Sequence, residues 1–151
     1  MLAAIVYSLG CFVIASVMTF LWAITRPIRM RDEMRSWRVL LFTFGLCFLL
    51  PYGYNETLTR VFGDQLQSAV EDGYARIPID GPLQYYKVTE FKKNKARVLI
   101  VAQERQEWGG VDRPMVWIDL VKEEGKWRTD SYKIANSLKF NREQYIFPVY
   151  W

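Results

Sequence analysis

Two stretches without a charged residue constrain this chain of 151 residues more than any other feature of its sequence. The first runs from Met1 to Thr25 and the second from Val39 to Asn55, whereas the region from Glu56 to Trp151 is rich in charge. An apolar helix of about 20 residues is long enough to cross the hydrocarbon core of a bilayer. The sequence therefore predicts a membrane portion of roughly a third of the chain, joined to a water-facing portion.

Each apolar stretch is expected to form one transmembrane helix, over about residues 2–24 and 39–54. The first lacks the basic start of a removable signal peptide, and it is longer than the apolar core of such a peptide, which has about 7 to 15 residues. The second is near the short end of what can span, and Pro51 predicts that it kinks or ends just before the interface. We thus expect a transmembrane hairpin over residues 1–54, with a connecting loop at 25–38.

The connecting loop predicts the orientation of the hairpin. It carries five arginines against two acidic residues, and positive residues close to a span favour the cytoplasmic side. Both termini would then be extracytoplasmic. We expect a bacterial inner membrane, with a thylakoid or organelle membrane as the alternative. The arginines are also the predicted contacts to anionic membrane lipids, and a cytoplasmic partner is the other use open to them: Arg26, Arg29, Arg31, Arg35 and Arg38.

The position of the positive charge argues against a nucleic-acid partner. Of the net charge of +4, the loop from Arg26 to Arg38 contributes +3 (five basic, two acidic residues). The region from Asn55 to Trp151 contributes only +1 (fifteen basic, fourteen acidic residues). A nucleic-acid-binding domain needs a basic face of its own, and this domain has almost no excess charge with which to build one.

The sequence lacks most of the residues with which enzymes work. It has no histidine, the usual general base and a common metal and haem ligand. No phosphate-binding glycine loop, nucleophile-elbow serine motif or paired-cysteine motif occurs in the water-facing region. The two cysteines, Cys11 and Cys47, lie inside the apolar segments. We therefore predict a protein that is not an enzyme and that binds neither a cofactor nor a metal.

The water-facing region, residues 55–137, has the pattern of an α+β domain. From Thr57 to Ala75 apolar residues recur at spacings of three and four, which predicts an amphipathic helix with Gly73 as its C-cap. The residues of its predicted apolar face are Leu58, Val61, Phe62, Leu66, Ala69 and Val70. Four strand-like runs follow, at residues 84–91, 96–108, 114–123 and 126–134, and their short separators, such as Glu124-Gly125, favour an antiparallel meander. In the third run, Val116, Ile118 and Leu120 are expected to face one way and Met115, Trp117 and Asp119 the other. The second run is apolar on both faces from Val98 to Ala102, so we expect it to be central. One helix would then pack on a four-stranded sheet.

The last hairpin carries a resemblance to a known group of folds. An apolar strand, acidic residues, a glycine and a Lys-Trp pair follow one another in Leu120–Trp127, after a helix and a meander. Over Asn55 to Asn136 the chain is similar to the nuclear transport factor 2-like and cystatin-like α+β folds. That resemblance implies a cone-shaped domain and no particular reaction. It also suggests a possible pocket, for which the candidate lining residues are Tyr85, Phe91, Trp117, Asp119 and Tyr132.

Asp119 interrupts an apolar strand, which leaves two interpretations open. Its carboxylate would either project into such a pocket and pair with Arg128 or Lys133 across the sheet, or lie on the solvent face and form an ordinary cross-strand ion pair. The second interpretation is the simpler one.

The C-terminal tail, residues 138–151, is unusually aromatic for a chain end. We expect it either to pack back on the open face of the sheet or on the membrane surface, or to insert into a partner subunit, where aromatic anchors dominate binding. The candidate partner-binding residues are Tyr145, Ile146, Phe147, Tyr150 and Trp151.

Two functions are consistent with these features. The first is an accessory or scaffold subunit of a larger membrane protein complex, whose outer domain and aromatic tail dock other subunits. The alternative is a membrane-tethered module that binds a small molecule or a peptide in a cone-like pocket. An open apolar pocket in the sheet domain would favour the second.

Overall fold

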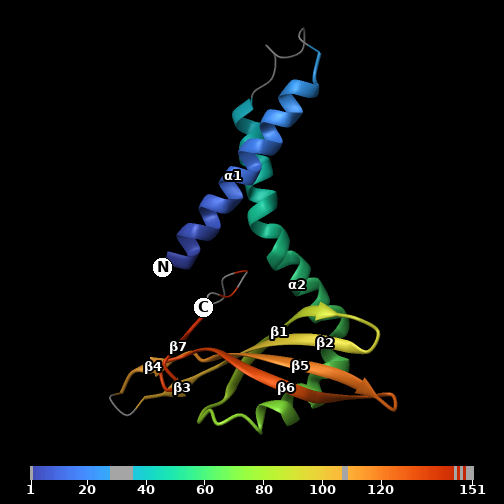
Figure 1. Ribbon diagram of the computed structural model, residues 1–151, viewed down its shortest axis with the longest axis vertical. Coiled ribbons are helices and arrows are strands. Elements are labelled where there is room, and N and C mark those ends of the chain that lie inside the picture. The colour runs from blue at the N-terminus through green and yellow to red at the C-terminus, as the bar shows by residue number, and fades with distance from the viewer. Residues whose placement is uncertain (1, 28–35, 107–108, 145, 147, 149–151) are drawn as a thin grey trace. The chain divides into compact units, whose positions relative to one another are not determined.

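The structure is a computed structural model that describes residues 2–27, 36–106, 109–144, 146 and 148. Two long helices, α1 (Leu2–Thr25) and α2 (Ser36–Tyr74), are followed by an antiparallel-sheet domain (Figure 1). The chain divides into two compact units, one with α1 and the part of α2 up to Gly53, the other from Tyr54 to Ile146. The predicted sequence of two apolar helices and an α+β domain is confirmed.

The helical unit is held together by one seam of α1. Tyr7, Cys11 and Ala15 are its buried residues, and their spacing of four places them on one side of the helix. The Tyr7 hydroxyl donates a hydrogen bond to the Phe48 carbonyl at 2.6 Å, and the two rings lie 5.0 Å apart. Most other large apolar side chains of this unit are exposed, among them Phe20 at 64% and Phe42 at 74%.

Of the two outcomes predicted at Pro51, a kink or the end of the helix, the second does not occur. Helix α2 continues through Pro51 to Tyr74, so the apolar span and the amphipathic helix of the next unit form one element of 39 residues. A proline inside a helix removes a single hydrogen bond and strains the turn before it. Here both flanking segments have helical periodicity and tertiary contacts of their own, and these keep the helix intact across the proline.

The sheet has five strands rather than the four predicted. Their order is β1-β2-β5-β6-β7, all antiparallel, with bounds β1 Leu83–Phe91, β2 Lys95–Ala102, β5 Met115–Glu123, β6 Lys126–Ser137 and β7 Arg142–Glu143. The four long strands form the expected meander. Strand β7 has only two residues, too few for a periodic pattern that sequence analysis can recognise.

The predicted hairpin between the last two long strands is confirmed, whereas the predicted strand run 96–108 is divided, because β2 ends at Ala102. Glu124 and Gly125 both have positive φ, as a two-residue type I′ turn between β5 and β6 requires. Between β2 and β5 the chain forms a small separate ribbon of β3 (Glu104–Arg105) and β4 (Val111–Asp112). Strand β2 is central, as expected, and every residue from Val98 to Ala102 is fully buried.

Helix α2 packs on one of the two faces of the sheet. The face that packs on α2 is called the inner face, and it forms the core with Leu66, Ala69 and Val70 of the helix. Its strand residues include Val88, Val98, Ile100, Val116, Ile118 and Leu120. The opposite face, called the outer face, carries the alternate residues of β5, Met115, Trp117, Asp119 and Val121. The predicted alternation in this strand is confirmed.

One residue of the predicted apolar helix face is placed differently. Leu66, Ala69 and Val70 are buried and Leu58 packs at the edge of the core, but Val61 is 62% exposed. The helix meets β1 at its edge, where the Thr59 hydroxyl accepts a hydrogen bond from the Val88 amide at 2.9 Å. Val61 therefore lies beyond the strip of helix surface that the sheet covers.

Gly73 does not cap the helix, contrary to prediction. It is a buried residue inside α2 without positive φ, and a Cβ atom there would lie 2.4 Å from the Thr129 hydroxyl oxygen of β6. That hydroxyl donates to the Ala69 carbonyl at 2.9 Å and is therefore held in place. The glycine allows the helix and β6 to approach closely.

The matched pair Gly73→Ala and Gly63→Ala tests this role. Alanine at 73 is expected to destabilise the sheet domain by about 2 kcal/mol because Thr129 must move. A Cβ atom at position 63 would make ordinary van der Waals contacts, the nearest with the Tyr86 hydroxyl at 3.4 Å. The better helix propensity of alanine then makes the substitution neutral or stabilising by up to about 1 kcal/mol. Urea unfolding of the full chain in detergent measures both, and equal effects would contradict the close-approach role.

Candidate functional site

Two of the five arginines expected at the cytoplasmic end of the helices lie in the described structure. The Arg26 guanidinium stacks 3.9 Å from the centre of the Trp22 ring, and the Arg38 guanidinium lies 5.5 Å from that of Trp37. Each pair combines a cation with an aromatic ring of the kind found at membrane interfaces. Arg29, Arg31 and Arg35 lie outside the described residues.

The aromatic tail is described only in part. Ile146 is 8% exposed and therefore buried in the fold, and the tail is tied to β6 where the Gln144 amide donates to the Ala135 carbonyl at 3.0 Å. Tyr145, Phe147, Tyr150 and Trp151 lie outside the described residues. For Ile146 the structure favours packing within the protein over a free anchor.

The five residues suggested as a pocket lining do not converge on one cavity. Tyr85, Trp117 and Asp119 lie on the outer face, since their register partners in β2 are Val101, Leu99 and Arg97. Phe91 stacks on Phe62 of α2 with ring centres 3.8 Å apart, so it belongs to the inner face. Tyr132 is the register partner of the core residue Ile118 and is 45% exposed.

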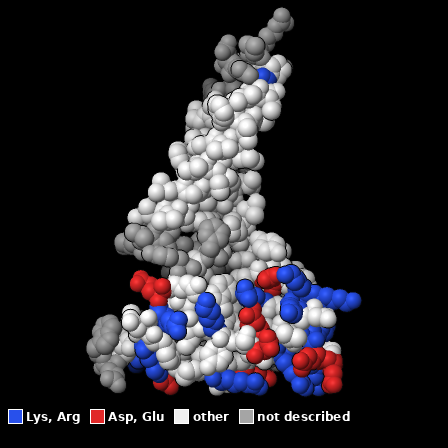
Figure 2. All heavy atoms as spheres, in the orientation of Figure 1, with Lys and Arg blue, Asp and Glu red and all other residues white. Residues whose placement is uncertain are grey.

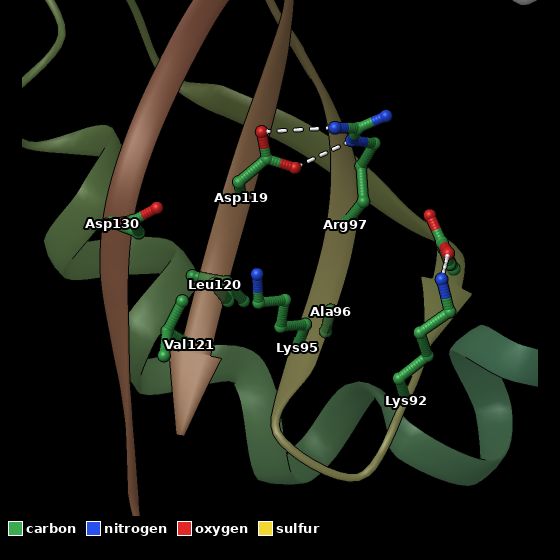
Figure 3. Close-up of a pocket in the computed structure, with 9 residues that line it drawn as sticks. Lys92, Lys95, Ala96, Arg97, Asp119, Leu120, Val121 and Asp130 are labelled. Carbon is green, nitrogen blue, oxygen red and sulfur yellow. Dashed lines mark hydrogen bonds and ion pairs between the residues drawn. The ribbon is translucent and has the colours of Figure 1, made fainter. Parts of the chain in front are cut away.

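Asp119 does line a cleft of about 300 Å³, which crosses the strands near the hairpin ends (Figure 3). The cleft is lined mainly by charged side chains of both signs: Glu90, Lys92, Lys95, Arg97, Asp119 and Asp130, with Ala96, Leu120 and Val121. Such a lining has no net charge, so it selects neither a simple anion nor a simple cation. It also lacks the apolar surface of a typical small-molecule pocket.

Asp119 pairs across the sheet with a residue that the sequence analysis did not select. The Arg97 guanidinium donates to both Asp119 carboxylate oxygens, at 2.6 and 3.3 Å, and this carboxylate raises the pKa of the arginine. Arg128 and Lys133, the predicted partners, lie on the other neighbouring strand. There a bulge at Asp130 places Ser131, rather than a cation, opposite Asp119. Both side chains are 39% exposed or more, so the pair adds little stability.

A buried carboxylate at the start of β3 is the main polar feature that sequence analysis missed. Glu104 is 2% exposed, and one of its oxygens accepts from the Asp80 amide at 3.1 Å and from the Lys139 ammonium at 3.4 Å. Lys139 also pairs with the Asp80 carboxylate at 2.7 Å. These contacts, called the Glu104 clasp, fasten the loop after α2 and the segment after β6 to the start of the β3-β4 ribbon. Nothing in the spacing of these residues indicates that they meet.

The Glu104 clasp predicts that the loss of stability caused by a Lys139 substitution disappears at alkaline pH. Asp80 and then Glu104 raise the pKa of the Lys139 ammonium. Because the pKa is higher in the folded state, the contribution of Lys139 is complete below the ordinary lysine pKa of about 10.4, and it is lost as the pH rises through the folded value. Urea midpoints should therefore show Lys139→Met less stable than the wild type at pH 8 and equally stable at pH 12. A constant difference would contradict the charge contribution.

The distribution of charge separates the two units. On the face drawn in Figure 2, charged side chains gather over the sheet domain, and few are visible on the described part of the helical unit. Within the part of the chain that the structure describes, no cluster of acidic residues or cysteines is arranged to hold a metal ion. Comparison with known proteins adds no further guide, because no family model, no curated protein and no solved structure matches this chain.

Proposed function

We propose that this protein is a membrane-anchored accessory subunit, which uses α1 and the first half of α2 as a transmembrane hairpin and presents its sheet domain to other subunits. The observation that carries the proposal is the exposure of large apolar side chains along both helices, which water would not tolerate. Helix α1 has 24 residues and so a length of about 36 Å, sufficient for one crossing.

A role in assembly suits the hairpin surface. A shallow apolar groove of about 440 Å³ lies beside Ala4, Ser8 and Phe12 of α1 and Phe44 of α2. Small residues one turn apart, such as Ala4 and Ser8, allow the close approach of a further transmembrane helix from another subunit. The absence of histidine and of a recognisable catalytic motif in the sequence agrees with a role in binding rather than catalysis.

The proposed orientation places both termini and the sheet domain outside the cytoplasm, in a bacterial inner membrane. Labelling with a membrane-impermeant maleimide tests this. Leu138 is 63% exposed on the sheet domain, so Leu138→Cys should be labelled in intact cells, whereas Arg26→Cys should react only after the membrane is opened. The opposite pattern would reverse the orientation, and release of the protein by alkaline carbonate would exclude a transmembrane anchor.

Partner binding is tested by native-gel migration after mild detergent extraction, with mass spectrometry of co-migrating proteins. We expect a large assembly. Deleting residues 149–151 removes Tyr150 and Trp151 but keeps the buried Ile146, and it should release the protein from that assembly if the tail is a contact. Leu138→Ala on the sheet domain is the control. Migration of the wild type as a small species without other proteins would reject the subunit role.

The ligand-binding alternative is favoured by one observation only, the cleft beside Asp119. The ligand-binding hypothesis, as the fold resemblance suggests it, requires an apolar cone-like pocket, but the cleft beside Asp119 is polar. Ligand screening of the full chain is therefore the second experiment, after the native gel.

A further inference from the structure

Strand β6 has a long open edge in the described sheet domain, on the side that faces away from β5. On its other side β6 pairs with β5 from Lys126 to Asn136. On the edge of β6 that faces away from β5, strand β7 pairs only with Asn136 and Ser137. Next to this pairing, the Gln144 amide donates a hydrogen bond to the Ala135 carbonyl. From Lys126 to Ile134 no described strand lies alongside. An open edge of this length presents backbone donors and acceptors to which another strand can add.

Charged side chains and a bulge often protect such an edge, and β6 has both. On β6, however, the charged side chains on the two sides of Thr129 have opposite signs. Arg128 and Asp130 flank Thr129, and both lie on the outer face, since Arg128 is the register partner of Val121 and the bulge residue Asp130 lines the outer-face cleft. Figure 3 shows Asp130 without an ion pair among the residues drawn. Arg128 has only a loose pair with Glu123, at 3.8 Å.

This arrangement is self-complementary. If two copies of β6 pair antiparallel with Thr129 opposite Thr129, Arg128 of each copy lies opposite Asp130 of the other. Both side chains lie on the outer face, so each of these cations meets an anion across the twofold axis, and no like charges lie opposite each other there.

We propose that β6 is a dimerisation edge, at which a second copy of this chain adds antiparallel in the register centred on Thr129 and the two sheets become continuous. A twofold contact uses the same surface on both copies, and it therefore requires the self-complementarity that Arg128 and Asp130 supply. A strand from a different protein would need no such symmetry. The sheet domains carry a net charge of only about +1 each, so they repel each other weakly.

Charge reversal and charge exchange test the register. The full chain is reconstituted in lipid nanodiscs or mild detergent, and its mass is measured by light scattering over a range of concentrations. Asp130→Arg places arginines opposite each other, and Arg128→Asp does the same with aspartates. Each should raise the dimer dissociation constant on the order of tenfold or more. The double variant Arg128→Asp, Asp130→Arg exchanges the charges and should restore the dimer.

Hydrogen exchange gives the second readout. Residues 127–134 of the wild type should be more protected at concentrations where it is dimeric than in Asp130→Arg, while the amides of β2 stay unchanged and show that the variant is folded. A monomeric wild type overturns the proposal. So does a dimer that is insensitive to both reversals, or one that the exchange fails to restore. Protection of β6 that appears only in native membranes would assign the edge to a different protein. None of these outcomes depends on whether a larger assembly exists.

Discussion

Replacing Gly81 by alanine is expected to lower the free energy of unfolding of the sheet domain by about 3 kcal/mol, the largest effect of any single methyl group in the chain. A Cβ atom at this position would lie 1.9 Å from the Gln103 carbonyl oxygen and 2.8 Å from its carbonyl carbon. Both are backbone atoms of Gln103, which lies between β2 and β3, so no side-chain rotation relieves the contact. The two backbone segments would have to separate.

That separation would break the contacts that fasten the loop after α2. The Tyr74 hydroxyl donates to the Gly81 carbonyl at 2.6 Å, and the Gln103 amide donates to the Pro82 carbonyl at 3.1 Å. Thermal unfolding of the full chain in detergent should show a midpoint lower by more than about 10 °C, given the size of the domain. Gly63→Ala is the control, and an equal midpoint for the two variants would contradict the close backbone contact.

The second large effect is expected at Glu104. Truncation to alanine removes the acceptor of the Asp80 amide, one partner of Lys139 and the volume of a side chain that is 2% exposed. A buried donor left without an acceptor costs about 1 to 3 kcal/mol, and the cavity adds to this. We therefore expect a loss of about 3 kcal/mol in urea unfolding.

Glu104→Gln separates the two contributions. The amide keeps the shape of the side chain and can still accept from the Asp80 backbone, but it carries no charge toward Lys139. It should lose roughly 1 kcal/mol, because Lys139 keeps its pair with Asp80 in a partly exposed position. If glutamine were as damaging as alanine, the charge rather than packing and the backbone hydrogen bond would hold the clasp.

Local patterns were sufficient for much of the sheet domain. The alternation of Val116, Ile118 and Leu120 with Trp117 and Asp119 predicted which face of β5 is buried, since side chains of a strand alternate whatever its neighbours are. The Glu124-Gly125 pair predicted a tight hairpin, because few residues other than glycine adopt positive φ easily. The central position of β2 followed from its continuous apolar run.

The candidate site was less predictable. Tyr85 and Phe91 both belong to β1 and were expected to share a pocket, but a bulge lies between them and Phe91 stacks on α2. A single extra residue moves all later side chains to the other face, and no local signal marks where it occurs. A second bulge, at Asp130, changes the register of β6 in the same way, and Ser131 lies opposite Asp119.

The sequence by itself determined which parts of this chain are apolar, the order of helices and strands, and the faces that strands bury, because these depend on composition and on the periodicity of neighbouring residues. Only the tertiary structure decided that α2 continues through Pro51, that Gly73 and Gly81 are points of close approach, and that Glu104 meets Asp80 and Lys139. These features arise from contacts between residues far apart in the chain. Their energies depend on packing distances, which no local pattern encodes.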